Sequence, residues 1–209
     1  MKFTAALVIA AAALLAGCVS VSVGSSDTPA IVYYVLADAR RAAVPTGPPQ
    51  ATDRLAVQGI AGDAIADSLS IVYSRQSSER AFYQFASWSE RPTSRIALLA
   101  QQRLQAGGRF ASVTQLGQPV AADWLLTLAL DTLVHDVSVT PGRAQLVLRA
   151  DLISRRDRSL VAQRSFSAAP PVAEPAAAAA VDAFATATAD VLDQLTAWVE
   201  ATVAANARR

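Results

Sequence analysis

Apolar side chains occupy every second position in two stretches near the middle of the chain. They run from Trp124 to Leu130 and again from Ala144 to Leu152. A period of two predicts β-strands with one buried face. Thr140-Pro141-Gly142 lies between the two stretches and predicts a turn, so they form a hairpin whose even-numbered residues face the core. The polar residues 155–158 then lead to a third strand over 160–166.

Two other stretches have the period of an α-helix. After Pro92, apolar residues recur at helical spacing until Gly107-Gly108, which marks the end of the helix. A longer helix follows Pro175 and begins with the alanine-rich residues 176–180. Its apolar stripe contains Phe184, Val191, Leu192, Leu195, Trp198 and Val203. We expect Trp198 to face the sheet together with Trp124, Leu128 and Leu148.

Shorter segments rich in β-branched and aromatic residues predict the remaining strands. They are residues 31–36, 55–60, 69–73, 81–85 and 110–116, and residues 63–67 form a turn or a single helical turn. The predicted fold class is therefore α+β, with an antiparallel-rich sheet and two main helices packed on one face.

The N-terminus has the pattern of an export signal. Lys2 precedes fourteen uncharged residues, too few for a helix across about 30 Å of hydrocarbon. The run fits a secretory signal peptide, and its ending Leu15-Ala16-Gly17-Cys18 resembles a bacterial lipobox. We expect a signal peptide over 1–17, an acylated Cys18, a flexible tether over 18–30 and one domain over 31–205.

Charge and composition exclude several function classes. Lys and Arg number 18 against 17 Asp and Glu, and no basic block argues for nucleic acid as a partner. With one cysteine and one histidine, His135, ligands for zinc or haem are scarce, so we expect no metal and no cofactor. No nucleophile elbow or phosphate-binding glycine loop occurs. We interpret His135 as a surface or hydrogen-bonded structural residue and expect no enzyme activity.

Aromatic residues are the best candidates for contact with a partner. Tyr33 and Tyr34 are adjacent on a predicted strand and must face opposite ways, which leaves one of them for a partner surface. Tyr83 and Phe85 belong to an aromatic group in which we expect Phe82 and Trp88 to pack in the core. Core packing is the alternative interpretation for the whole group.

Four segments behind the lipobox resemble a known family in their order and spacing. They are residues 33–36, 82–90, 110–113 and 128–136, which read YYVL, FYQFASWSE, FASV and LALDTLVHD. Together they are similar to the ABC-type transport auxiliary lipoprotein components, the PqiC-like family. Leu133 departs from the family pattern, which often has an aromatic residue there.

The resemblance implies a periplasmic lipoprotein of Gram-negative bacteria that assists an ABC permease, its ATPase and a mammalian-cell-entry-type protein. Such systems move lipids or other hydrophobic molecules between the inner and outer membranes. Val19 follows the cysteine where an inner-membrane protein would have Asp, which favours the periplasmic side of the outer membrane. A homo-oligomer is possible. The alternatives are a lipid carrier with its own apolar cavity and, third, a periplasmic hydrolase.

Overall fold

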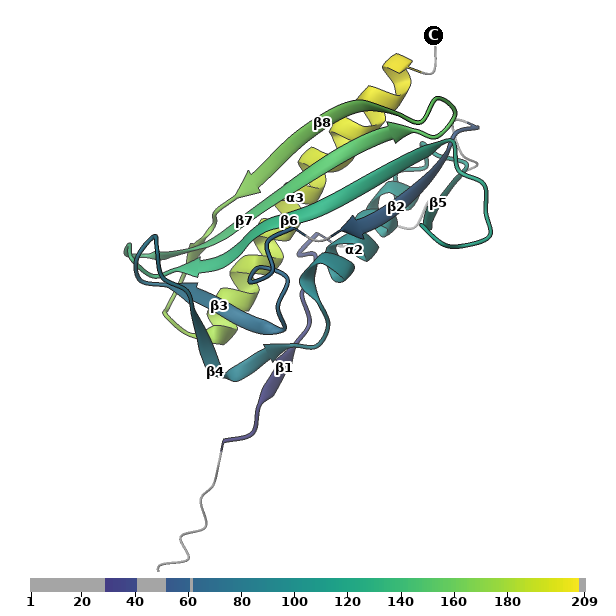
Figure 1. The fold of residues 1–209 in the computed structure, drawn as a ribbon. Coiled ribbons are helices and arrows are strands. Elements are labelled where there is room, and N and C mark those ends of the chain that lie inside the picture. The colour runs from purple at the N-terminus through teal and green to yellow at the C-terminus, as the bar shows by residue number, and fades with distance from the viewer. Residues whose placement is uncertain (1–28, 41–51, 61, 207–209) are drawn as a thin grey trace, which may run out of the picture. The chain divides into compact units, whose positions relative to one another are not determined.

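The computed structural model describes residues 29–40, 52–60 and 62–206. The chain divides at Ala30 and Ile31 into two compact units, and every helix and strand below belongs to the second unit. Its strands are β1 (Val32–Tyr34), β2 (Arg54–Ile60), β3 (Ser70–Ser74), β4 (Ala81–Trp88), β5 (Ser112–Gln115), β6 (Trp124–Asp136), β7 (Gly142–Ser154), β8 (Ser159–Ala168) and β9 (Pro171–Val172), and its helices are α2 (Pro92–Ala106) and α3 (Ala177–Asn206) (Figure 1).

One mixed sheet is built around β6. On one side β6 pairs antiparallel with β7, which pairs antiparallel with β8 and β9. On its other side β6 pairs in parallel with β2 along its first half and with β3 at its end. From there β5 continues beside β2, and β4 and then β1 continue beside β3.

The predicted α+β class with both helices on one face of the sheet is confirmed (Figure 1). The antiparallel-rich sheet is wrong, because four of the eight strand pairings in the described residues are parallel. The three-stranded meander of β6, β7 and β8 is joined by short turns that the sequence reveals. The parallel pairings join strands far apart in the chain, and no local signal marks them.

A bulge in β6 changes which residues face the helices. The β6–β7 register shifts between Leu130 and Thr132. Even-numbered residues face the core up to Leu130, as expected. Beyond the shift Leu133 belongs to the core cluster and His135 is fully buried, while Val134, although buried, lies outside that cluster. An extra residue in one strand reverses the alternation, so the even-numbered prediction is wrong for the end of β6.

The loop after β2 passes close to the backbone of β6 at this bulge. The Asp63 N–H donates to the Leu130 carbonyl over 3.0 Å. A Cβ at Gly62 would lie 2.3 Å from that same carbonyl oxygen, so the close approach of the two backbones requires glycine.

The first helix has the predicted ends. α2 begins at Pro92 and is followed by Gly107, and the residue before it, Arg91, has no side-chain capping bond. Asp67, in the loop between β2 and β3, caps the helix instead, because its Oδ1 accepts the Thr93 N–H over 2.8 Å.

Both helices pack on the sheet through one hydrophobic core. α3 covers β7 and β8, while α2 covers β2 and β5 and touches α3. Trp88 packs edge-on against Phe184 with ring centroids 5.9 Å apart. Trp198 is half-buried and packs in the same way on Phe166 at 5.6 Å, so it faces the sheet as predicted.

Replacing Leu128 by Ala should lower the free energy of unfolding by about 2–5 kcal/mol, since its side chain is fully buried and its removal leaves a cavity in the core. Chemical denaturation of the protein would measure this. The matched control is Leu160→Ala on β8, where the leucine is 58% exposed and the expected loss is below about 0.5 kcal/mol. Equal losses in both variants would contradict the assigned core.

Candidate partner-binding surface

The strand β1 lies at one end of the sheet and exposes most of its apolar side chains. In the described residues it pairs only with β4. Exposed side chains at this place are Ile31, Val32, Tyr33, Val35 and Phe85, of which the first four lie on β1 or directly beside it in the chain, and Phe85 lies on β4. We call these five residues the β1 surface. Exposed apolar residues that gather on a strand are typical of a protein contact site.

The two candidate tyrosines face opposite ways, as predicted. Tyr34 lies opposite Trp88 in the β1–β4 ladder and is half-buried against the hydrophobic core. Tyr33 lies opposite Ser87 and is 66% exposed. Tyr33 is therefore the member of the pair that a partner can reach.

The aromatic residues of β4 divide differently from the prediction. Trp88 is buried, as expected, but Phe82 is exposed, so its assignment to the core is wrong. The β3–β4 register shifts between Ser70 and Val72, which interrupts the alternation along β4 and turns Phe82 outward. Phe85 is 38% exposed and is the β4 candidate that reaches the surface most clearly.

The fourth candidate, Tyr83, has its hydroxyl group engaged inside the protein. That oxygen lies 2.8 Å from Nδ1 of His135, and the Tyr83 ring packs on Tyr73 with centroids 5.0 Å apart. Burial raises the pKa of Tyr83 above its ordinary value. Tyr83 is half-buried, so it can offer a partner only part of its ring.

His135 is a structural residue of the sheet. Its side chain is fully buried, and its Nε2 has no hydrogen-bond partner in the described residues. A Cβ at Gly142 would lie 2.5 Å from Nε2, so the glycine makes room for the imidazole. Burial lowers the pKa of His135. The charge of Asp136 acts in the opposite direction, but its effect is smaller. A ring enclosed in this way has no exposed nitrogen with which to act on a substrate.

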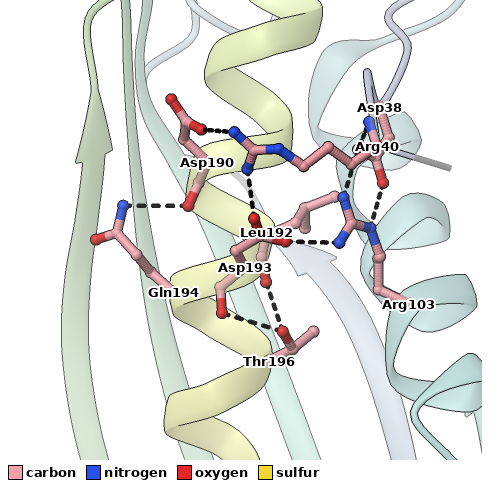
Figure 2. Close-up of polar contacts among 8 residues, drawn as sticks. All are labelled: Asp38, Arg40, Arg103, Asp190, Leu192, Asp193, Gln194 and Thr196. Atoms are coloured by element: carbon pink, nitrogen blue, oxygen red, sulfur yellow. Dashed lines mark hydrogen bonds and ion pairs between the residues drawn. The ribbon is translucent and has the colours of Figure 1, made fainter. Parts of the chain in front are cut away.

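An ion-pair network fastens the segment after β1 to both helices (Figure 2). Arg103 of α2 donates to both carboxylate oxygens of Asp38, one of them over 2.7 Å, and to Asp193 of α3 over 2.6 Å. Arg40 bonds Asp190 over 2.5 Å and also pairs with Asp193. Because the side chains of Arg103 and Asp38 are mostly buried, their bidentate pair has fixed geometry.

Sequence reasoning missed this network. In the sequence, Arg103 and Asp193 are ordinary polar residues of two helical segments. Asp38 lies 65 positions from Arg103, and Arg103 lies 90 positions from Asp193. Charged residues this far apart carry no spacing signal, and only the packing of α2 beside α3 brings them together.

Buried side chains from the sheet and both helices form one hydrophobic cluster between the two layers. A surface cleft of about 470 Å³ lies beside the ion-pair network and is lined by Arg40, Asp190 and residues at the end of β8 and just after it. No helix in the described ranges is long and apolar enough to cross a membrane. Cys18, the predicted signal peptide and nearly all of the predicted tether lie outside the described residues.

The buried imidazole should make stability depend on pH. Below about pH 6.5, the ordinary pKa of histidine, the unfolded chain binds a proton that folded His135 resists. The free energy of unfolding should therefore fall as the pH drops from 7 towards 5. Urea denaturation across this range, beside a titration of the imidazole by NMR, would measure it.

The control for this prediction is His135→Asn, which removes the titrating ring. Burial raises the pKa of Glu200, which stabilises the folded state as the pH falls and so opposes the effect of His135. That opposing contribution is common to both proteins, so the difference between them isolates His135, the single histidine. Parallel pH profiles for the two proteins would contradict the prediction.

Comparison with solved structures supports the fold. The chain is similar to protein XCC0632 from Xanthomonas campestris, with 23% identity, a TM-score of 0.75 and coverage of 84% of this chain and 99% of that one. It is also similar to the crystal structure of an uncharacterized protein, with 12% identity, a TM-score of 0.60 and coverage of 81% and 99%. At these identities the likeness concerns the fold alone. No curated protein matches the sequence.

A family profile shows to which family the chain belongs. The profile described as "ABC-type transport auxiliary lipoprotein component" matches residues 34–196, which run from the end of β1 through the first two thirds of α3. This agrees with the resemblance read from four short sequence segments. The chain belongs to the family of ABC-type transport auxiliary lipoprotein components.

Proposed function

We propose that this protein is a non-enzymatic periplasmic lipoprotein that assists an ABC-type transport system linked to a mammalian-cell-entry-type protein. The system would move lipids or other hydrophobic molecules between the inner and outer membranes. The observation that carries the proposal is the family match over residues 34–196, since an auxiliary component of a transporter acts through another protein.

The N-terminal sequence supports attachment to the outer membrane. Cys18 follows Leu15-Ala16-Gly17 and would carry the acyl chains after residues 1–17 are removed. Val19 comes next, where an inner-membrane lipoprotein would have Asp. A tether over 18–30 reaches at most about 40 Å when fully extended, so the domain over 31–205 would stay near that membrane.

The β1 surface supports action by contact. Its aliphatic residues and Tyr33 are exposed, and Tyr is enriched where proteins bind one another because it buries a large area and keeps a polar group. Tyr33 and Phe85 would make the main contacts, with Tyr34 and Tyr83 supporting them from half-buried positions. A mammalian-cell-entry-type protein is the partner we propose for this surface.

The core favours this function over a lipid carrier. A carrier needs an apolar cavity large enough for an acyl chain. Here the helix-facing residues of β6 and β7 and the sheet-facing residues of α3 belong to one cluster of buried side chains. Leu128, Leu148 and Leu192 in that cluster are fully buried. Lipid would then be carried by other components of the system.

Replacing Cys18 by Ser should abolish acylation, because serine lacks the thiol that receives the lipid. Each buried CH₂ contributes about 0.8 kcal/mol to membrane binding, so two or three chains make a stable anchor. Metabolic labelling with palmitate, followed by membrane fractionation, measures both effects. Equal label on both proteins would overturn the lipoprotein assignment of Cys18.

Replacing Tyr33 by Ala should weaken binding to a purified mammalian-cell-entry-type protein of the same transport system by about tenfold, since a central exposed Tyr often dominates an interface. The matched control is Leu160→Ala on β8, which removes another mostly exposed side chain, at a different edge of the sheet. Binding measured by surface plasmon resonance should be unchanged in the control. Unchanged binding in Tyr33→Ala would remove the β1 surface from the proposal.

A further inference from the structure

The backbone of β1 has an open edge at Tyr33. In the parallel β1–β4 ladder, the Tyr34 carbonyl accepts the Ser89 N–H over 2.8 Å, so the backbone groups of Tyr34 point towards β4. Backbone groups of successive residues in a strand point in opposite directions. The N–H and C=O of Tyr33 therefore point away from β4, and they have no partner in the described residues.

In the described residues the edges of β5 and β8 are protected, and the edge of β1 is not. On β5, the Val113 N–H donates to Gln105 over 2.8 Å and the Val113 carbonyl accepts from Gln101 over 3.0 Å, so two α2 side chains occupy these backbone groups. On β8, the edge carries Gln163 and Arg164, and a charged side chain discourages pairing. Residues 31–36, IVYYVL, contain no charge and no proline.

The edge is also held in a fixed position. Arg95 of α2 donates to the Leu36 carbonyl over 2.8 Å, directly after β1. Asp38 is clamped by Arg103, and the Ala39 N–H donates to the Ala185 carbonyl of α3 over 3.2 Å. A strand edge ordered before binding loses less conformational entropy when a partner arrives.

We infer that a segment of the transporter partner adds to the open edge of β1 as a further strand. The N–H and C=O of Tyr33 would bond the backbone of that segment, while its apolar side chains would cover Ile31, Tyr33 and Val35. The inference rests on the proposed function, because it names how the partner binds the same surface. A bilayer is a poor occupant, since hydrocarbon offers no donor or acceptor for the backbone of Tyr33.

Hydrogen exchange resolved to single amides tests the inference directly. The full-length lipoprotein is compared alone and with the purified mammalian-cell-entry-type protein of the same system. Exchange at the Tyr33 amide should slow by about tenfold or more, because it gains a hydrogen bond. Exchange at the Tyr34 amide, which already faces β4, should stay unchanged. Unaltered exchange at Tyr33 in a complex that forms would overturn strand addition.

A pair of variants separates the backbone of Tyr33 from its side chain. Tyr33→Ala keeps the N–H, and Tyr33→Pro removes it, while proline is tolerated on an edge strand where the N–H faces outward. We expect Tyr33→Pro to bind the partner about tenfold more weakly than Tyr33→Ala. Equal affinities would leave the docking function standing and overturn strand addition. Wild-type affinity in both variants would overturn both proposals.

Two further arms identify other occupants and check the fold. The first adds vesicles of phosphatidylethanolamine and phosphatidylglycerol without the partner, and the second raises the protein concentration while sedimentation reports self-association. If exchange at the Tyr33 amide slows in either case, the partner strand is the wrong occupant. Thermal melting compares Tyr33→Pro with wild type. Should the proline variant fail to fold, the exchange experiment on the unaltered chain decides the matter.

Discussion

The antiparallel pairing of β6 with β7 is the interaction on which the rest of the domain depends. Its helix-facing residues are buried beneath the two helices, and burial of apolar area is the main source of folding free energy. Every other part of the sheet attaches to this ladder, since β2 and β3 share one side of β6 while β8 and β9 lie beside β7. A slip of one residue in β6 would turn Leu128 and its other helix-facing side chains outward, so the register is strongly determined.

The bulge after Leu130 lies between the two parts of β6 that pair with different parallel strands. β2 ends its pairing at Ala129, and β3 begins its pairing at His135. The loop that contains Gly62 crosses in the interval between them. The consequence is a buried imidazole with one nitrogen unpaired in the described residues, which costs free energy unless the surrounding packing compensates. The hydrogen bond to Tyr83 satisfies the other nitrogen of the ring, and the missing side chain of Gly142 leaves space for the imidazole.

The hydrophobic core and the proposed partner surface occupy different parts of the domain. The core joins α2 and α3 to the middle of the sheet, whereas the β1 surface lies on an end strand, from which the half-buried Tyr34 packs against the core. The ion pairs from Asp38 and Arg40 to the two helices hold that end strand in place (Figure 2). Arg103 bonds one carboxylate from the segment after β1 and one from α3, so a single guanidinium joins three parts of the chain.

The sequence by itself determined the elements whose signals are local. The alternation in β6 and β7, the turn at Thr140-Pro141-Gly142 and the limits of α2 follow from neighbouring residues, and so does the opposite orientation of Tyr33 and Tyr34. Only the tertiary structure decided the parallel pairings, the reversed alternation at His135, the outward turn of Phe82 and the clamp on Asp38. The physical reason is that each of these depends on residues distant in the chain, whose contacts leave no period or spacing to read.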